Sequence, residues 1–317
     1  MHLPSPVLRS RRPINARIHA AVAHHRIPLL SVQDKISTDL LLVRHPTVAQ
    51  FIDNLDTQIH SRRTLLIANT PPVNSDGRDF CYEIEECAYN AQTAFGGEVL
   101  VVPESPQTGR LIRNIVPSVA MSDFTWPGFL QDDEISSQPR QSNHLRTPVV
   151  GRHSRDHRLK WPDSAEEIIQ TYVGRGSFAT SILGGASSIA DIVDLSAYGV
   201  RVIEFGAQEP ADYLRGIDFW VYQHSREWTE SFGMAILEAM ANGCVVVLPH
   251  YLRKLFGDGA IYCEASEVRG LVGGMWRSPE QYRTQSSKGL EVARSHFSSS
   301  AYVARVQAVL SGESANG

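Results

Sequence analysis

The stretch Glu230-Ser-Phe-Gly-Met-Ala-Ile-Leu-Glu238-Ala-Met-Ala-Asn-Gly243 decides the fold, because it predicts a helix between two apolar runs. The runs, residues 218–222 and 244–248, are almost continuously apolar, which is typical of strands buried on both faces. Gly243 stands at the C′ position of the expected helix, where a left-handed residue is needed. A strand, a helix and a strand in this order predict a right-handed crossover within a parallel sheet.

The same alternation extends through the second half of the chain. The expected strands are residues 148–151, 178–183, 200–205, 218–222, 244–248 and 260–263. The expected helices are residues 165–172, 187–198, 210–215 and 232–242, followed by a helical tail over 267–276, 279–297 and 299–310. This pattern predicts a doubly wound α/β domain over residues 148–317.

The first half carries the alternation more faintly. Strand-like runs at 39–43, 64–68 and 99–102 are each followed by a turn signal and then by a helical pattern. We therefore expect a smaller α/β domain over residues 1–147. Its last part, residues 130–147, is polar and aperiodic and is expected to be a linker.

Length and composition fit two globular domains. The chain has 317 residues, and a domain holds about 150. A net charge of -4 excludes the broad basic field that non-specific nucleic-acid binding needs. The four cysteines form no C-x-x-C pair, so neither a zinc site nor a disulfide framework is expected and a reducing, cytoplasmic setting fits best.

The amino-terminal segment is basic. Residues 1–30 contain arginines and no acidic residue. This composition fits a peripheral contact with acidic lipid at the inner face of a membrane, or a solvated basic face, which is the favoured interpretation. No apolar run approaches the ~20 residues that a membrane-spanning helix needs.

The decisive stretch also suggests an anion site. We expect Ser231 to be the N-cap, which leaves the backbone N–H groups of the next residues unpaired at the positive end of the helix dipole. These residues are Phe232, Gly233 and Met234. Glu230 and Glu238 are expected at the carboxyl ends of the strands, where doubly wound sheets bind ligands. Two carboxylates there could accept hydrogen bonds from sugar hydroxyls, although the spacing fits equally a helix with a solvated Glu at each end.

These residues carry a family resemblance. The segment from Glu230 to Gly243 resembles the E-x7-E motif of glycosyltransferase family 4, whose members are retaining, nucleotide-sugar-dependent enzymes of the GT-B fold. Residues 218–222 and 244–249 resemble the flanking strands of that family. Residues 150–163 resemble its G-R-…-K-G segment, and Leu183-Gly184-Gly185 its next glycine turn.

The resemblance implies a GT-B-like α/β fold, with two Rossmann-like doubly wound domains facing a cleft. The amino-terminal domain is expected to be shortened, because residues 1–30 contain no strand followed by a glycine-rich turn. The implied activity is transfer of a sugar from a UDP- or GDP-sugar to a hydroxyl of a glycan, lipid or small molecule, with retention, in carbohydrate or cell-envelope glycan biosynthesis. No cofactor and no metal are expected, since no Asp-x-Asp motif occurs.

The resemblance also implies residue roles. Glu230 would contact the hydroxyls of the donor sugar and act in catalysis, and Glu238 would contact the ribose hydroxyls. Arg152 and Lys160 would hold the diphosphate by a bidentate guanidinium and a point charge. About two extra residues separate this pair compared with the family, so Arg155 or Arg158 could replace either member; without the resemblance the loop would be an ordinary solvated one.

Two further assignments are less specific. Phe205 and Gly206 would lie near the nucleobase, although a Phe at a strand end is more often part of the core. His45 ends a run that resembles the family strand with a functional His near the reacting carbon. A structural His at a strand end is an equal alternative.

Other functions are compatible with the same motifs. A non-catalytic GT-B subunit could bind nucleotide or a partner and support an active glycosyltransferase, and a second chain could complete the acceptor side. A sugar-nucleotide epimerase of this fold is a third alternative, but the E-F-G-x4-E-A-M-A form favours the transferase.

Overall fold

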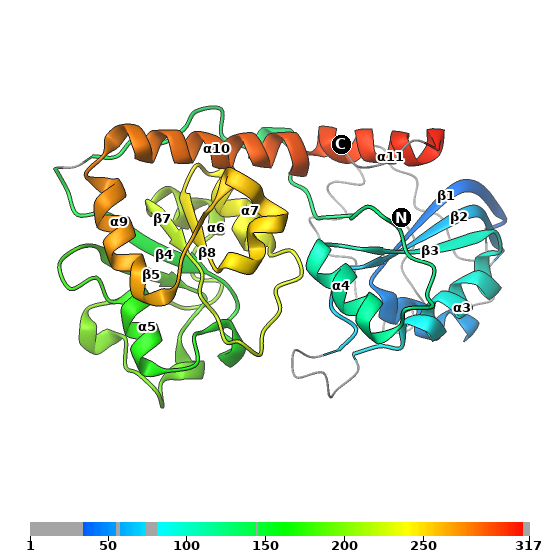
Figure 1. The fold of residues 1–317 in the computed structure, drawn as a ribbon, viewed down its shortest axis with the longest axis horizontal. Coiled ribbons are helices and arrows are strands. Elements are labelled where there is room, and N and C mark those ends of the chain that lie inside the picture. Colours follow the sequence, from blue (N-terminus) through cyan, green and yellow to red (C-terminus); the bar gives the residue numbers. More distant parts are fainter. Residues whose placement is uncertain (1–33, 55–57, 74–80, 144, 313–317) are drawn as a thin grey trace. The chain divides into compact units, whose positions relative to one another are not determined.

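The computed structural model describes residues 34–54, 58–73, 81–143 and 145–312. The chain forms two compact units (Figure 1). The first contains Met1–Pro127 and Ala308–Gly317, and the second is Gly128–Gln307. Each unit contains a parallel β-sheet with its own apolar core.

The first unit is a small α/β domain, as predicted. Its sheet has the order β1-β2-β3, and its elements are β1 (Ile36–Arg44), the 3₁₀ helix η1 (Pro46–Asn54), β2 (Ile59–Ala68), α3 (Ile84–Phe95), β3 (Glu98–Pro103) and α4 (Pro106–Ile115). Ser105 caps α4 by accepting from the backbone of Thr108, and Pro106 occupies the first turn. The basic segment 1–30 lies outside the described residues.

The second unit contains a six-stranded, entirely parallel sheet. Its strands are β4 (Val149–His153), β5 (Ala179–Leu183), β6 (Arg201–Ile203), β7 (Phe219–Val221), β8 (Val245–Leu248) and β9 (Ile261–Tyr262). The order is β6-β5-β4-β7-β8-β9. All six strands predicted in this half are confirmed. From β4 the chain first builds the sheet in one direction and then, from β7, in the other, so the direction reverses between these two strands.

Helices surround this sheet in Figure 1. They are α5 (Ala165–Tyr172), α6 (Pro210–Arg215), α7 (Met234–Ala241), α8 (Arg253–Phe256), α9 (Val268–Trp276) and α10 (Pro279–Phe297), followed by α11 (Ser299–Ser311). Short 3₁₀ turns connect them: η2 (Asp132–Glu134), η3 (Arg158–Lys160), η4 (Ser187–Ile189), η5 (Ser196–Tyr198), η6 (His250–Leu252), η7 (Gly257–Gly259) and η8 (Ala265–Glu267). The predicted helices at α5, α6 and α10 are confirmed, and Gly243 is left-handed as predicted, with φ 73°.

The prediction of one helix over residues 187–198 is wrong. The structure has two 3₁₀ turns there, η4 and η5. Asp194 accepts hydrogen bonds from the backbone N–H and the hydroxyl of Ser196, and Asp156 accepts from the backbone and hydroxyl of Ser188. Such local bonds between side chain and backbone compete with the helical ladder.

Residues 130–147, expected to be a linker, pack within the second unit. Leu130 and Ile135 belong to its core. The guanidinium of Arg140 donates to the carbonyls of Leu214 in α6 and Asn242 at the end of α7, at 2.8 Å each. A basic side chain at the ends of two helices satisfies carbonyls that have no partner within the helix.

The helices and the cysteines bear on two expectations from the sequence. Among the described helices, none has both the length and the apolar character needed to cross a membrane. None of the four cysteines forms a disulfide, and Cys81 is the exposed one.

Candidate functional site

The candidate site lies in the second unit, at the carboxyl ends of β4 and β7. These strands are neighbours in the sheet, and the strand order reverses between them. In open parallel sheets this is where ligands bind, because the two crossovers leave the sheet on opposite faces and open a crevice. Polar side chains from the segments that follow β4, β7 and β8 lie together here.

Glu230 is the centre of a partly buried cluster of polar contacts. Its Oε2 accepts from the hydroxyl of Tyr222 at 2.9 Å and from the indole N–H of Trp228 at 3.1 Å. The Nζ of Lys160 lies 3.6 Å from the same oxygen. Burial, and then the charge of Glu230, hold the pKa of Tyr222 well above its usual value, so its hydroxyl stays a donor. All three contacts use Oε2, and Oε1 keeps its capacity to accept from a ligand.

The backbone of Glu230 is held by a second chain of hydrogen bonds. Its N–H donates to the hydroxyl of Tyr251 at 3.1 Å, which lies 2.8 Å from Nε2 of His224. The Nδ1 of His224 lies 2.7 Å from the carbonyl of Ser225, which can only accept. His224 is therefore protonated at Nδ1 and accepts from Tyr251 at Nε2. Burial lowers the pKa of His224, which favours this neutral form.

Arg152 lies beneath the loop that carries Lys160. Its side chain is almost fully buried, at 1% exposure. The guanidinium donates to the carbonyl of Lys160 at 2.7 Å and to the hydroxyl of Ser154 at 2.6 Å, and it stacks 4.0 Å from the centre of the Trp161 ring. No carboxylate of the described residues pairs with it, and its Nε lacks a hydrogen-bond partner there. A buried cation without a counter-ion is costly, so an anion at this loop would be stabilised.

The other basic residues of the loop have different surroundings. Arg158 donates to the backbone carbonyls of Pro162 and Asp163 at 3.0 and 2.8 Å, so its guanidinium fixes the loop. Arg155 is exposed. Asp156 accepts from Ser187, Ser188 and the indole of Trp161. Burial alone would raise the pKa of Asp156, but these hydrogen bonds outweigh it and lower the pKa.

Glu238 lies on α7 and contacts the end of β4. Its Oε2 lies 2.7 Å from Nε2 of His153, and Nδ1 of His153 lies 2.9 Å from the indole nitrogen of Trp220. The side chain of Glu238 is 35% exposed, whereas that of His153 is 7% exposed. His153 thus holds one oxygen of Glu238, while the carboxylate remains partly exposed to solvent.

The start of α7 differs from the prediction. The helix begins at Met234 with Gly233 as its N-cap, so the prediction of Ser231 as N-cap is wrong. Gly233 has φ 80°, and a Cβ there would lie 2.7 Å from Cδ1 of Ile236. This left-handed turn, which only glycine adopts without strain, moves the cap two residues along the chain. Phe232 is buried in the core, while Met234 is 40% exposed.

The first N–H groups of α7 still have no partner within the helix. Ile236, the third residue of the helix, donates to the carbonyl of Gly233 at 2.9 Å. The positive end of the dipole therefore begins next to Glu230, whose Cγ lies 3.2 Å from the position of a Cβ on Gly233.

Phe205 and Gly206 follow β6, two strands away from β4. Phe205 is 73% exposed, so it is not a core residue, and Gly206 has φ 80°. Within the part of the chain that the structure describes, no hydrogen bond or ring contact joins this pair to the cluster around Glu230. Gly184, after β5, is tightly constrained, because a Cβ there would lie 1.9 Å from the carbonyl oxygen of Ser154.

His45 belongs to the first unit and directly follows β1. Its backbone is left-handed, with φ 75°, which is uncommon for a residue with a side chain. Strain of this kind collects at functional sites. The side chain is exposed, and partial desolvation and the adjacent charge of Arg44 lower its pKa. Arg44 itself pairs with the buried Glu104 at 3.1 Å.

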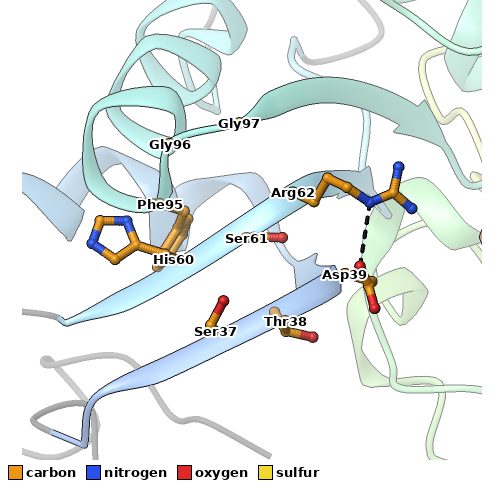
Figure 2. Close-up of a pocket in the computed structure, with 9 residues that line it drawn as sticks. All are labelled: Ser37, Thr38, Asp39, His60, Ser61, Arg62, Phe95, Gly96 and Gly97. Carbon is orange, nitrogen blue, oxygen red and sulfur yellow. Dashed lines mark hydrogen bonds and ion pairs between the residues drawn. The ribbon is translucent and has the colours of Figure 1, made fainter.

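The first unit contains a hollow of about 540 Å³, which none of the predicted site residues lines. Figure 2 shows its lining: Ser37, Thr38, Asp39, His60, Ser61, Arg62, Phe95, Gly96 and Gly97. These residues surround the amino ends of β1 and β2, the sheet edge opposite to the one where doubly wound sheets bind ligands. Arg62 already pairs with Asp39 at 3.3 Å, and Ser61 donates to a backbone carbonyl. This hollow is therefore not the candidate site.

Sequence reasoning assigned no role to several residues of the cluster. They are His153, Trp220, Tyr222, His224 and Tyr251. Two of them are adjacent to features that the sequence did predict. His153 follows Arg152, a predicted diphosphate ligand, and Tyr222 ends a predicted strand. Polar side chains at the carboxyl end of buried strands were the available signal. Among the described residues, no group of three His, Cys, Asp or Glu side chains could hold a metal ion.

No family model and no curated protein matches the sequence. Solved structures match the fold. HepE of Anabaena, in complex with UDP and glucose, aligns with a TM-score of 0.62 at 15% identity, over 94% of this chain and 90% of HepE. Sucrose-phosphate synthase from Thermosynechococcus elongatus aligns with a TM-score of 0.61 at 16% identity, over 93% and 77% of the two chains.

TarM of S. aureus, in a complex that includes UDP, aligns with a TM-score of 0.62 at 15% identity, over 86% of this chain and 55% of TarM. These neighbours are GT-B glycosyltransferases. At such identities the likeness shows the fold, and the predicted α/β architecture with Rossmann-like domains is confirmed.

Proposed function

We propose that the protein is a retaining glycosyltransferase that uses a nucleoside diphosphate sugar. The observation that carries the proposal is the placement of Glu230, which two hydrogen-bond donors and the ammonium of Lys160 anchor at the point where the strand order reverses. The family resemblance of the surrounding motif and the UDP and sugar in the structures of fold neighbours support it.

Glu230 would receive the donor sugar. With Oε2 held by Tyr222, Trp228 and Lys160, the carboxylate is fixed before the ligand arrives, and Oε1 can accept from sugar hydroxyls. The indole of Trp228 lies beside this oxygen, with the Lys160 ammonium 5.1 Å from its ring centre. A sugar could rest against this aromatic surface.

The diphosphate would take the positive charge of the β4 loop. The side chain of Lys160 is 19% exposed and pairs with Glu230 at 3.6 Å, so its ammonium could exchange Glu230 for a phosphate oxygen. Arg152 supplies a charge without a carboxylate partner and holds the backbone of Lys160, and the exposed Arg155 could reach the outer phosphate. The start of α7, with Ser231, Phe232, Gly233 and Met234, adds backbone N–H groups.

The remaining donor contacts follow the family resemblance. Glu238 would bind the ribose hydroxyls, and Phe205 and Gly206 would lie near the nucleobase, which we propose to be uracil or guanine. The exposure of Phe205 is compatible with stacking on a base. His45 would act on the donor sugar, and its strained backbone supports a functional role.

The reaction balances without a protein base. The bond from the anomeric carbon to the phosphate oxygen breaks, and the bond to the acceptor oxygen forms on the same face. The acceptor's proton passes to the departing phosphate. Lys160 and the start of α7 stabilise the negative charge that grows on this phosphate, which is why no metal is proposed. Four cysteines without a disulfide among them support a reducing, cytoplasmic setting.

The test is product analysis with UDP- and GDP-hexoses and a panel of hydroxyl acceptors. We expect release of nucleoside diphosphate and, by NMR of the anomeric proton, a product with the donor's configuration. Glu230→Gln should lower turnover about 10²-fold or more, whereas Glu227→Gln, which changes an exposed neighbour, should not. An inverted product would contradict retention. Donor binding without hydrolysis or transfer would favour the non-catalytic subunit instead.

A further inference from the structure

His153 occupies an unusual place beneath the ligand edge of the sheet. It is the last residue of β4, its side chain is 7% exposed, and its ring lies edge-on to Trp220 with the centroids 5.9 Å apart. A polar ring is costly at this depth unless both of its nitrogens have partners. Both do, and the partners differ in chemistry.

The hydrogen bonds fix the tautomer. An indole N–H can only donate, so Nδ1 of His153, at 2.9 Å from Trp220, must be the unprotonated acceptor. The proton of the imidazole is then at Nε2, where it donates to Oε2 of Glu238 at 2.7 Å. Trp220, His153 and Glu238 thus form a chain with one direction, in which each donor points toward the carboxylate.

This chain selects one orientation of Glu238. The helix α7 is apolar apart from this residue, and the neighbours Leu237 and Ala239 are fully buried. With its side chain 35% exposed, an unsupported glutamate here would sample several rotamers. The bond to His153 fixes Oε2, and the partly exposed carboxylate keeps Oε1 as an acceptor for a ligand.

We infer that His153, oriented by Trp220, is a positioning residue that makes the donor site select ribonucleotides over 2′-deoxyribonucleotides. The inference rests on the proposed function, in which Glu238 binds the ribose. A carboxylate fixed in one rotamer accepts from the 2′ and 3′ hydroxyls without first losing rotamer freedom. A nucleotide that lacks the 2′ hydroxyl leaves this acceptor without its partner, so the fixed geometry discriminates between the two.

The test measures nucleotide affinity by calorimetry. UDP and GDP are compared with 2′-deoxy-UDP and 2′-deoxy-GDP, so that any nucleotide bound by the wild type has its matched analogue. We expect the wild type to prefer the ribonucleotide on the order of tenfold or more, as one hydrogen bond to a charged group implies. His153→Phe should lose most of this preference while its affinity for the deoxy analogue changes less than about twofold.

Three further variants separate positioning from a general structural role. His153→Gln keeps an acceptor toward Trp220 and a donor toward Glu238, so it should restore the preference. Trp220→Phe removes the donor that fixes the tautomer and should reduce the preference. The double variant His153→Phe/Glu238→Ala should be no worse than Glu238→Ala alone, because the two residues act as one unit. His296→Gln, at an exposed position of α10, is the control and should match the wild type.

The outcomes are distinct. The inference is overturned if His153→Phe keeps the wild-type preference, or if its affinity falls equally for the ribonucleotide and the deoxy analogue. Either result leaves the proposed function standing. A wild type that binds neither UDP nor GDP overturns the proposed function and this inference with it. If His153→Phe does not fold, the His153→Gln and Trp220→Phe comparison decides, and the same preference in both would overturn the inference.

Discussion

Replacing Lys160 by methionine tests the charge balance of the site. Its Nζ lies 3.6 Å from Oε2 of Glu230, an attraction of about 5 kcal/mol at an effective dielectric constant of ~20. A diphosphate must compete for the ammonium against this attraction, so most of the gross Coulomb energy cancels on binding. The net loss in Lys160→Met should therefore be that of one hydrogen bond to a charged group, about 1.5–3 kcal/mol, or roughly 10- to 150-fold in Kd.

Calorimetry with a nucleoside diphosphate and with the matching nucleoside resolves this effect. The variant should lose affinity for the diphosphate, while affinity for the nucleoside, which carries no phosphate, stays within about twofold. Lys288→Met, at an exposed position of α10, serves as the control. The fold should persist, because Tyr222 and Trp228 still donate to Glu230. Equal affinities of wild type and Lys160→Met for the diphosphate would refute the assignment of Lys160 to the phosphates.

Three other predictions concern stability. Tyr222→Phe removes a buried donor to Glu230 and should lower the free energy of unfolding by about 1.5–3 kcal/mol, read from the urea midpoint; an unchanged midpoint would contradict the anchoring role. Burial lowers the pKa of His224, so its contribution to stability is full above about pH 6.5 and is lost as pH falls through the lowered pKa. Unfolding free energies from pH 7 to 5 should accordingly fall less in His224→Gln than in wild type, and equal slopes would refute this. Gly233→Ala places a Cβ 2.7 Å from a neighbouring isoleucine at φ 80° and should cost about 1–3 kcal/mol, whereas Gly274→Ala in α9, which meets no atom within 4 Å, should be neutral or stabilising by thermal melting.

The periodicity of the sequence was enough to predict the sheet of the second unit. Continuous apolar runs such as residues 244–248 have few alternatives to a buried strand, and Gly243 marks the end of α7. Local side-chain chemistry was harder to weigh. Residues 187–198 have a helical pattern, but Asp156 and Asp194 capture the backbone and hydroxyl donors of nearby serines. Asp156 is far away in the sequence, so its effect is not visible in a local window.

The site was predictable as a location more than as a network. The motif placed Glu230 and Glu238 at the ligand edge, which the strand order confirms as the point of reversal. The partners of these carboxylates come from β4, β7 and the segment after β8. The spacing of residues along one helix cannot predict these partners, because they come from other segments of the chain. His153 illustrates this, because only the pairing of β4 with β7 brings it beside Trp220.

The proposed function requires that the second unit bind a nucleoside diphosphate sugar beside Glu230. Thermal unfolding with a panel of UDP- and GDP-sugars tests it most directly, because a ligand at a hundred times its Kd stabilises the folded state by about 2.7 kcal/mol. For a unit of this size that corresponds to a rise in Tm of roughly 5–11 °C. We expect such a rise with at least one donor, and a much smaller one with Lys160→Met. No rise in the wild type with any donor would contradict it.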